Sequence, residues 1–285
     1  MSLVKITFPS TPPSSSPNLN PTYVLTLSSP PDHRLTESLL AEFGEALNAI
    51  EKDWWVRRRE QGTDKPIKNQ VGGAVIVRGE GEKFFSNGLD FENSVKNPDF
   101  HPTVFNPLYL RLLTFPLVTI AAINGHAFAG GYMIALACDF RVMKKEAAGR
   151  KFWCCMNEID FGAPFPVLFA TALRGRVPAR VLRDTLLGHR FTSSELYAHG
   201  VVDVLSEPSD EGLMGAAQSL SDRYGPKSAG RVWGSIKQDI WSDIRVSAHS
   251  HFPPLMGDQA EARAERTFGL KKQDEESKSG ERAKL

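Results

Sequence analysis

Apolar residues follow two patterns that alternate along most of this chain. Between Thr36 and Trp54 they lie three and four residues apart, which predicts an amphipathic helix with Thr36 as its N-cap. Short continuous apolar runs instead predict buried strands, at Tyr23–Leu27, Val71–Val77 and Leu117–Ile123. The two patterns alternate repeatedly, and this alternation favours an α/β fold with parallel strand pairs.

The same reasoning assigns the remaining elements. Further strands are predicted at Phe140–Met143, Phe152–Cys155 and Val201–Leu205. Helices are predicted to begin at Gly131 and to span Pro107–Thr114, Val167–Leu173, Ala179–Leu187 and Ser193–Ala198. Residues 79–90 are predicted to form a loop with an Asn-Gly turn. Beyond Glu207 the pattern is helical only, with helices expected at Glu211–Tyr224, Lys227–Trp241 and Gln259–Leu270.

These patterns divide the chain into four segments. Residues 1–22 hold an N-terminal strand and a Pro/Ser-rich stretch, and residues 23–205 form the α/β core. Residues 206–270 form a C-terminal helical region, and residues 271–285 form a charged tail without aromatic residues. We therefore expect one large layered core with a helical addition.

Composition excludes several classes of function. The 285 residues carry a net charge of +1, which gives no electrostatic reason to expect nucleic acid as a partner. The basic run Trp54–Arg59 is interpreted as the solvated end of a helix rather than as a phosphate-binding patch. Three cysteines, Cys138, Cys154 and Cys155, have neither disulfide nor metal-ligand spacing, so we expect no metal site. We also expect no membrane span and no signal peptide.

The last three residues, Ala283-Lys284-Leu285, are a conservative variant of the Ser-Lys-Leu peroxisomal address. Their position at the end of a charged segment keeps them accessible to a receptor. The tail therefore predicts a peroxisomal import receptor as a partner and the peroxisomal matrix as the location. The alternative is an ordinary solvated tail.

Two glycine-containing loops follow predicted strands. The segment from Ile123 to Phe140 places Gly130 and Gly131 at the start of a helix, where bare backbone N–H groups can face a developing negative charge. The segment Phe84–Asp90 again places a glycine, Gly88, after a buried strand. Each loop alone is more often an ordinary turn. Together they suggest two halves of an oxyanion hole, with the N–H groups of Leu89 and Gly130 as donors.

A third segment, Met156–Gly162, holds two carboxylates among apolar residues. Apolar surroundings disfavour the charged form of a carboxyl group, which raises its pKa and makes it a useful base. Either Glu158 or Asp160 alone could be a structural carboxylate. Because the two glycine loops point to a catalytic site, we favour Glu158 as the base and keep Asp160 as the next candidate.

These three segments, in this order, resemble the crotonase superfamily, also called the enoyl-CoA hydratase/isomerase family. Residues 85–90 are similar to the family's first oxyanion loop, and residues 124–131 are similar to the second. The Pro31–Thr36 segment resembles the loop on the adenine side of the substrate, with His33 where a small residue is common. The resemblance covers about Tyr23 to Leu205 and implies a crotonase-type ββα spiral core.

The resemblance also implies the roles of the site residues. Leu89 and Gly130 would donate their N–H groups to the thioester oxygen of an acyl-CoA, and Glu158 would be the catalytic base. The residues expected around the substrate are Ser86, Asn87, Gly88, Asp90, Gly131, Met133 and Phe161. Arg34 and Lys83 are candidates for the CoA phosphates. No cofactor is expected, because coenzyme A is part of the substrate.

The carboxylate positions narrow the reaction. Hydratases of this family carry a second glutamate at the position of Met133, dienoyl-CoA isomerases an aspartate at Pro166, and dehalogenase-like members an aspartate at Pro164. Glu158 alone remains, and a single base is enough for a 1,3 proton shift. The resemblance is therefore strongest to the peroxisomal Δ3,Δ2-enoyl-CoA isomerases of fatty-acid β-oxidation.

Three further expectations come from the resemblance. The family forms trimers or dimers of trimers, so a homotrimer or homohexamer is expected. Another acyl-CoA activity of the family, such as a hydratase of secondary metabolism, is the main enzymatic alternative. A non-catalytic acyl-CoA-binding protein is a different class of alternative, but a pure binder needs no carboxylate at Glu158.

Overall fold

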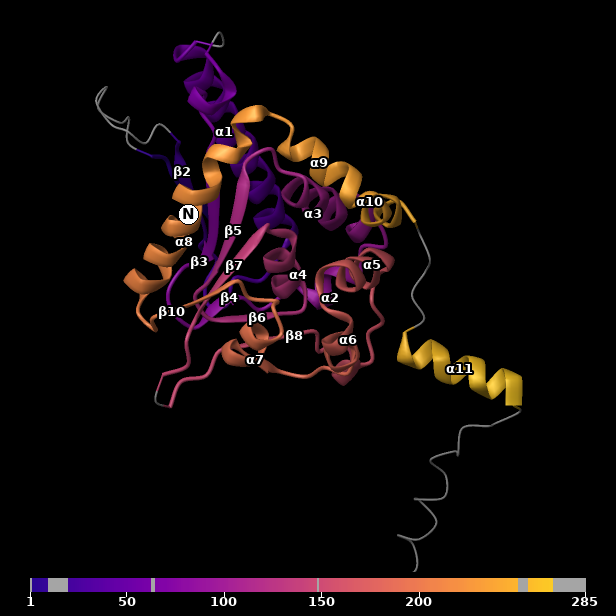
Figure 1. Cartoon of the computed structure of the whole chain (residues 1–285). Helices are drawn as coiled ribbons and strands as arrows, with labels where there is room; N and C mark the ends of the chain where they lie inside the picture. The colour runs from indigo at the N-terminus through magenta and orange to yellow at the C-terminus, as the bar shows by residue number, and fades with distance from the viewer. Residues whose placement is uncertain (1, 10–19, 63–64, 148, 251–255, 269–285) are drawn as a thin grey trace, which may run out of the picture.

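The computed structural model describes residues 2–9, 20–62, 65–147, 149–250 and 256–268 (Figure 1). Its largest sheet has six strands, in the spatial order β1 (Val4–Thr7), β2 (Thr22–Leu27), β3 (Ala74–Gly79), β5 (Val118–Ile123), β7 (Phe140–Lys144) and β10 (Val204–Ser206). β1 is antiparallel to β2, and every other neighbouring pair is parallel. The predicted α/β fold with parallel pairings is confirmed.

A second, smaller sheet carries the segments of chemical interest. It has four strands, in the order β4 (Phe84–Ser86), β6 (His126–Phe128), β8 (Trp153–Cys155) and β9 (Phe191–Thr192). The first three strands are parallel, and β9 is antiparallel to β8. β8 is predicted, as part of the run Phe152–Cys155. The other three strands are not, because their two or three residues are too few to show a pattern.

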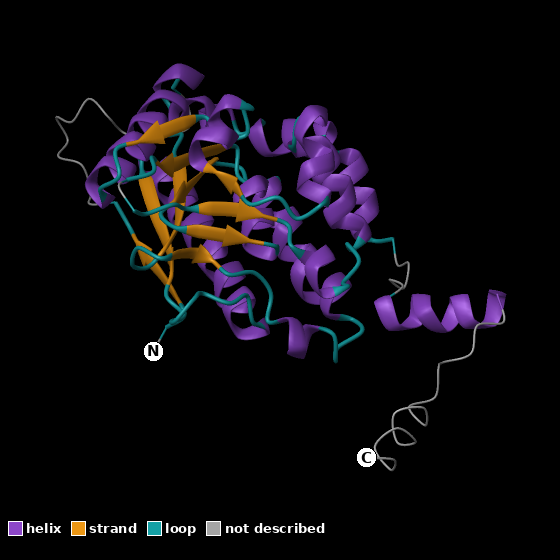
Figure 2. Cartoon of the chain, turned by 90° about the horizontal axis from the view of Figure 1, so that it is seen from below, coloured by secondary structure: helices purple, strands orange, loops and turns teal. Residues whose placement is uncertain are grey.

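Helices flank the strands (Figure 2). The helices are α1 (Glu37–Glu60), α2 (Phe91–Ser94), α3 (Asn106–Leu113), α4 (Gly130–Ala137), α5 (Val167–Arg176), α6 (Ala179–Leu186), α7 (Ser193–Ala198), α8 (Asp210–Tyr224), α9 (Trp233–Ile240), α10 (Ser242–Ala248) and α11 (Gly257–Phe268). Tighter turns occur at Ile67–Asn69, Glu158–Phe161 and Gly225–Gly230, and a π-helical turn at His101–Phe105.

Helix α1 matches its prediction closely. The hydroxyl oxygen of Thr36 accepts a hydrogen bond from the Leu39 amide, so Thr36 is the N-cap. The apolar positions of the predicted stripe are all buried: Leu39, Leu40, Phe43, Ala46, Leu47, Ile50 and Trp54. The basic end of the helix differs from its interpretation as solvated, because Arg58 is buried and donates to the carbonyl oxygens of Val71 and Ala229.

The large sheet buries both faces. On one face, apolar residues of β3, β5 and β7 form a cluster with Leu213 and Ala217 of α8. The alternate residues of the same strands, such as Val75, Ala121 and Met143, join the main core. Helix α8 therefore belongs to the layered core, although the sequence patterns place it in a separate helical region. The division into four segments itself stays a prediction.

One predicted helix is wrong in its continuity. Residues 227–241 do not form a single helix, because the tight turn Gly225–Gly230 ends at Arg231, whose φ of 63° is left-handed. Helix α9 begins only at Trp233. A left-handed residue cannot continue a right-handed helix, and this conformation leaves no trace in the apolar spacing.

Candidate active site

Three neighbouring parallel strands carry the three segments that the sequence singled out. β4 leads into the loop with Leu89, β6 leads into Gly130, and β8 leads into Glu158. β4 pairs with β6, and β6 pairs with β8, so the three strands lie side by side. The carboxyl ends of parallel strands meet at one edge of a sheet, which is where α/β proteins place their ligands. The fold thus brings the three predicted elements to one edge.

The first loop is held by main-chain contacts to the segment before α1. The Leu35 amide donates to the Gly88 carbonyl oxygen at 2.9 Å, and the Asn87 amide donates to the Asp32 carbonyl oxygen at 2.9 Å. Gly88 has a φ of 84°, a conformation that favours glycine because it has no Cβ. Its backbone is thereby turned so that Leu89 follows in a fixed position.

The second loop packs directly on the first. A Cβ added to Gly131 would lie 2.4 Å from the Ser86 carbonyl oxygen, and one added to Gly88 would lie 3.3 Å from the Gly130 nitrogen. Ala129, the residue before α4, adopts a φ of 46° although it is not glycine. Strained backbone of this kind is found at sites whose geometry the surroundings impose.

The two predicted donors both have free amide groups. Among the described residues, neither the Leu89 nor the Gly130 N–H donates a hydrogen bond. For Gly130 the reason is its place as the first residue of α4, where amides have no partner within the helix. Two unpaired N–H groups on touching loops fit the expected oxyanion hole.

Glu158 and Asp160 differ in their surroundings. Glu158 is only 7% exposed, and its Oε2 has no hydrogen-bond partner among the described residues. Burial raises the pKa of Glu158 to about 7, because the charged form loses its hydration. Asp160, two residues later in the same helical turn, is exposed. Burial therefore distinguishes the two carboxylates in favour of Glu158.

The residues expected around the substrate differ in burial, and some are fully buried whereas others lie nearer the surface. Ser86 and Met133 are fully buried, and Met133 belongs to the main core. Asp90 precedes α2 and accepts a hydrogen bond from the side chain of Asn93 at 2.7 Å. Phe161 is 46% exposed, so its ring lies at the surface beside the carboxylate segment. Their roles toward a substrate, like those of the other site residues, stay predictions.

Sequence reasoning missed Phe91, the first residue of α2. Its ring packs edge-to-face on Phe161, with centroids 5.1 Å apart. The contact links the segment after the first donor loop to the segment that carries Glu158. The only signal in the sequence was an aromatic residue directly after Asp90.

The two candidate cations for phosphate binding, Arg34 and Lys83, each contact another side chain. Arg34 pairs with Asp32 at 3.0 Å, and its side chain is 48% exposed. The Lys83 ammonium lies 5.3 Å from the centroid of the Phe84 ring. Both stay candidates.

The cysteines Cys154 and Cys155 are buried, as expected, and burial raises the pKa of the Cys155 thiol to about 12.

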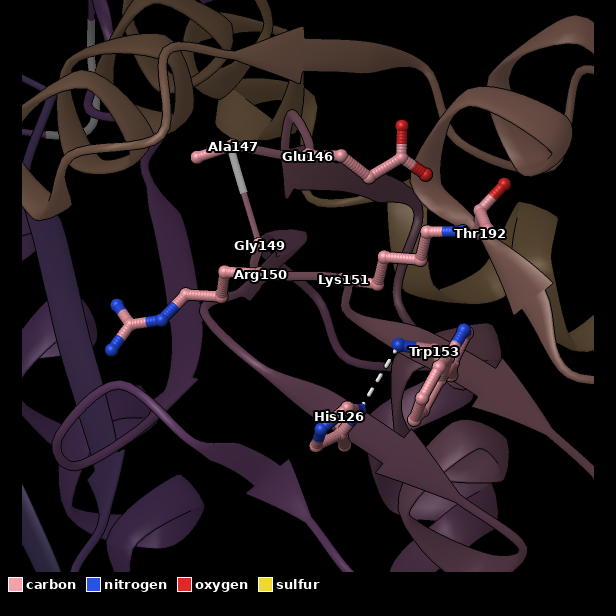
Figure 3. A pocket seen from close by; sticks show the side chains of 8 residues that line it. All are labelled: His126, Glu146, Ala147, Gly149, Arg150, Lys151, Trp153 and Thr192. Atoms are coloured by element: carbon pink, nitrogen blue, oxygen red, sulfur yellow. Dashed lines mark hydrogen bonds between the residues drawn. The ribbon is translucent and has the colours of Figure 1, made fainter.

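A cavity of about 690 Å³ lies at the other end of the small sheet (Figure 3). His126 and Trp153, the first residues of β6 and β8, line it together with Thr192. His126 accepts a hydrogen bond on Nδ1 from the Trp153 amide at 3.1 Å, and the two rings stack. His126 thus has a structural role, because it joins the first residues of β6 and β8. None of the predicted site residues lines this cavity.

The part of the chain that the structure describes holds neither a metal-type cluster nor a membrane-spanning helix. No group of three or more His, Cys, Asp or Glu side chains there is placed to hold a metal ion. None of the helices there combines the length and apolar character needed to cross a bilayer. The tripeptide 283–285 lies outside the described residues.

Known proteins are similar to this chain in sequence. The enoyl-CoA hydratase/isomerase family model matches residues 64–228. Enoyl-CoA delta isomerase 3 of Arabidopsis thaliana is 30% identical over 232 residues, which cover 78% of this chain and 89% of that protein. The peroxisomal enoyl-CoA delta isomerase 2 of the same plant is 30% identical over 185 residues, 60% of this chain and 75% of that protein.

Solved structures agree on the fold. An enoyl-CoA hydratase from Mycobacterium marinum superposes with a TM-score of 0.68 at 20% identity, covering 87% of this chain and 96% of that one. At this identity the likeness establishes the crotonase fold, which confirms the predicted spiral core. More than half of the sequence matches the family model, and the chain belongs to the enoyl-CoA hydratase/isomerase family.

Proposed function

We propose that this protein is a Δ3,Δ2-enoyl-CoA isomerase, which moves the double bond of a 3-enoyl-CoA into conjugation with the thioester. The observation that carries the proposal is the state of Glu158: buried, without a partner on Oε2, and with a pKa raised to about 7. A base with a pKa close to the operating pH is well matched to a proton transfer. The enoyl-CoA delta isomerase relatives support the same reaction class.

The chemistry needs one base and one oxyanion site. The ionised Glu158 carboxylate removes a proton from C2 of the 3-enoyl-CoA, and the electron pair moves onto the thioester oxygen. The N–H groups of Leu89 and Gly130 stabilise this enolate. The protonated Glu158 then returns its proton to C4, the C2–C3 double bond forms, and the carboxylate is regenerated. No water is consumed, and no redox change occurs.

The environment of α4 supports isomerisation over hydration. Hydration requires a water molecule oriented between two carboxylates, and the position expected for the second one holds Met133. Met133 is fully buried in the core, where it supplies no charge and no hydrogen bond for such a water. A hydratase-type activity is therefore the second candidate. It is tested by giving the enzyme crotonyl-CoA in parallel with 3-hexenoyl-CoA and following the conjugated thioester absorbance.

The cellular setting belongs to the same proposal. The terminal Ala283-Lys284-Leu285 supports import into the peroxisomal matrix, and two isomerase relatives are named as peroxisomal, whereas a third is named as mitochondrial. Fatty-acid β-oxidation is the pathway proposed there. No cofactor is proposed, because the thioester is activated by main-chain N–H groups. A homotrimer or homohexamer is the assembly that the family resemblance suggests.

A further inference from the structure

Two arginines hold the carboxyl end of α4, the helix whose first residue is Gly130. Arg176 donates from Nε to the Leu136 carbonyl oxygen at 2.7 Å and also donates to the Cys138 carbonyl oxygen. Arg141 donates to the same Cys138 oxygen at 2.8 Å. The last carbonyl groups of a helix have no partner within it, so the two guanidinium groups satisfy acceptors that would otherwise stay unpaired.

Arg176 also connects α4 to the carboxylate segment. It is the last residue of α5, which begins at Val167, nine residues after Glu158. Figure 1 shows α4 and α5 as neighbours on the same side of the sheet. The guanidinium of Arg176 lies 4.8 Å from the ring centroid of Trp241, which follows α9. One side chain therefore joins the helix with the donor Gly130, the helix that follows the base, and the C-terminal helices.

Arg176 stays cationic in this position. Burial and the nearby charge of Arg141 lower the pKa of Arg176, but an arginine pKa lies so far above neutrality that the group remains charged. Arg141 is paired with Asp203 at 3.2 Å, and the neighbouring Asp139 is paired with Lys237 at 3.1 Å. Both nearby carboxylates thus have other cationic partners, and Arg176 faces the helix end.

We propose that Arg176 is a positioning residue for the isomerase reaction, acting through α4. Cations at the carboxyl end complement the negative end of the helix dipole. They also fix the axial position of a helix that is only about 12 Å long. A shift of α4 displaces the Gly130 N–H from the place where the enolate oxygen forms, and small displacements of this kind cost large factors in rate. The inference rests on the proposed function.

Arg58 offers a matched control. It is buried, donates to two main-chain carbonyl oxygens, and lies 5.2 Å from the ring centroid of Trp54. Its acceptors are the carbonyl oxygens of Val71 and Ala229 and the side-chain oxygen of Gln70, and none of these residues lies in α4. R176M and R58M therefore both remove hydrogen bonds to two main-chain carbonyl groups, at different places in the fold. Replacing a purely structural arginine lowers only the stability of the protein. Replacing a positioning arginine lowers kcat as well.

The experiment compares purified R176M and R58M with the wild type at a temperature where all are folded. We expect R176M to lower kcat by about 10- to 100-fold. Its KM should stay within about threefold, because the CoA contacts are untouched. R58M should keep kcat within about twofold. Equal losses in the two variants, or unchanged kcat in R176M, would overturn the proposal. If R176M does not fold, the same comparison of kcat is made between R176K and R58K. Lysine keeps the charge of arginine but cannot make the double contact.

A spectroscopic readout separates this inference from the proposed reaction. Hexanoyl-CoA with a ¹³C label at the thioester carbonyl binds without double-bond migration, and an oxyanion site lowers its carbonyl stretching frequency. R176M should lose at least about half of that lowering while R58M keeps it. This result stands even if 3-hexenoyl-CoA is not isomerised, in which case the proposed function alone fails. A full frequency shift in R176M would refute the positioning role.

Discussion

The amide of Ala129 donates a hydrogen bond to the carbonyl oxygen of Cys155 at 2.8 Å. Ala129 directly precedes the donor Gly130, and Cys155 lies three residues before Glu158. This bond extends the pairing of β6 with β8 by one residue, to the place where both chains leave the sheet. The proposed oxyanion donor and the proposed base are thus held by adjacent backbone, rather than by flexible side chains.

Replacing Glu158 by glutamine should abolish most turnover while substrate still binds. Glutamine keeps the shape of the side chain but cannot accept the C2 proton, and general-base contributions are about a hundredfold to ten-thousandfold. Steady-state kinetics with 3-hexenoyl-CoA and a binding titration with hexanoyl-CoA measure the two effects. D160N is the matched control, because Asp160 is exposed. An active E158Q with an inactive D160N would move the base to Asp160.

The rate should depend on pH through the Glu158 carboxyl group. Its pKa is raised to about 7 by burial, and only the ionised form can act as a base. We therefore expect kcat/KM to rise about tenfold per pH unit below pH 7 and to level off above it. A profile of initial rates from pH 5 to 9 checks this. A flat profile across pH 6 to 7 would contradict the assignment.

The same pKa predicts how stability changes with pH. In the folded protein Glu158 binds its proton more tightly than in the unfolded chain, whose glutamates have an ordinary pKa near 4.5. Between pH 4.5 and about 7 the unfolded state loses this proton first, so the free energy of unfolding falls as pH rises. E158Q removes the penalty and should be more stable than the wild type by up to about 3 kcal/mol at pH 8.

At pH 4 the two proteins should be nearly equal in stability, because the wild-type carboxyl group is then protonated in both states. Urea unfolding at pH 4, 6 and 8 measures the difference. Curves for E158Q and the wild type that run parallel at all three values would show that Glu158 is not buried as described.

The contact between the two loops predicts a strong effect of one methyl group. A Cβ at Gly131 would lie 2.4 Å from the Ser86 carbonyl oxygen, so G131A must push the first loop away from α4. We expect turnover to fall by at least about a hundredfold, comparable to losing an oxyanion donor. G215A is the control, since Gly215 also lies in a helix but a Cβ there meets nothing within 4 Å. G215A should keep full activity and gain about 0.5–1 kcal/mol of stability.

Removing Ala283 to Leu285 should leave a fluorescently tagged protein in the cytosol, because the import receptor reads the terminal tripeptide. The tag is placed at the N-terminus so that the native tail stays free. A variant ending in Ala-Glu-Leu, K284E, serves as a length-matched control and should also stay cytosolic. Peroxisomal import of the truncated protein would remove the targeting proposal.

The sequence predicted the long elements and the three chemical segments for a clear physical reason. Helix α1 is long enough to show its period, and β5 is a six-residue apolar run. Gly88 and Gly130 mark places where the backbone must turn or approach closely. The strands β4 and β6, of three residues each, carry no such period. They are defined by pairing partners that lie far away in the sequence.

Two features of the site depend on tertiary contacts. The sequence favoured Glu158 and kept Asp160 as the next candidate, and the difference in burial between the two carboxylates appears only in the folded structure. The contact of Phe91 with Phe161 joins residues seventy positions apart, which no local pattern reveals. Burial and long-range packing arise when the elements assemble, so they were outside the reach of the sequence patterns.

The most direct test of the account is a paired assay of the wild-type enzyme with 3-hexenoyl-CoA and crotonyl-CoA. The appearance or loss of the conjugated enoyl thioester is followed by its ultraviolet absorbance. With Glu158 as the single base, conjugated product should form from 3-hexenoyl-CoA, and crotonyl-CoA should be hydrated at least about a hundredfold more slowly. Rapid hydration of crotonyl-CoA without any isomerisation of 3-hexenoyl-CoA would contradict the account.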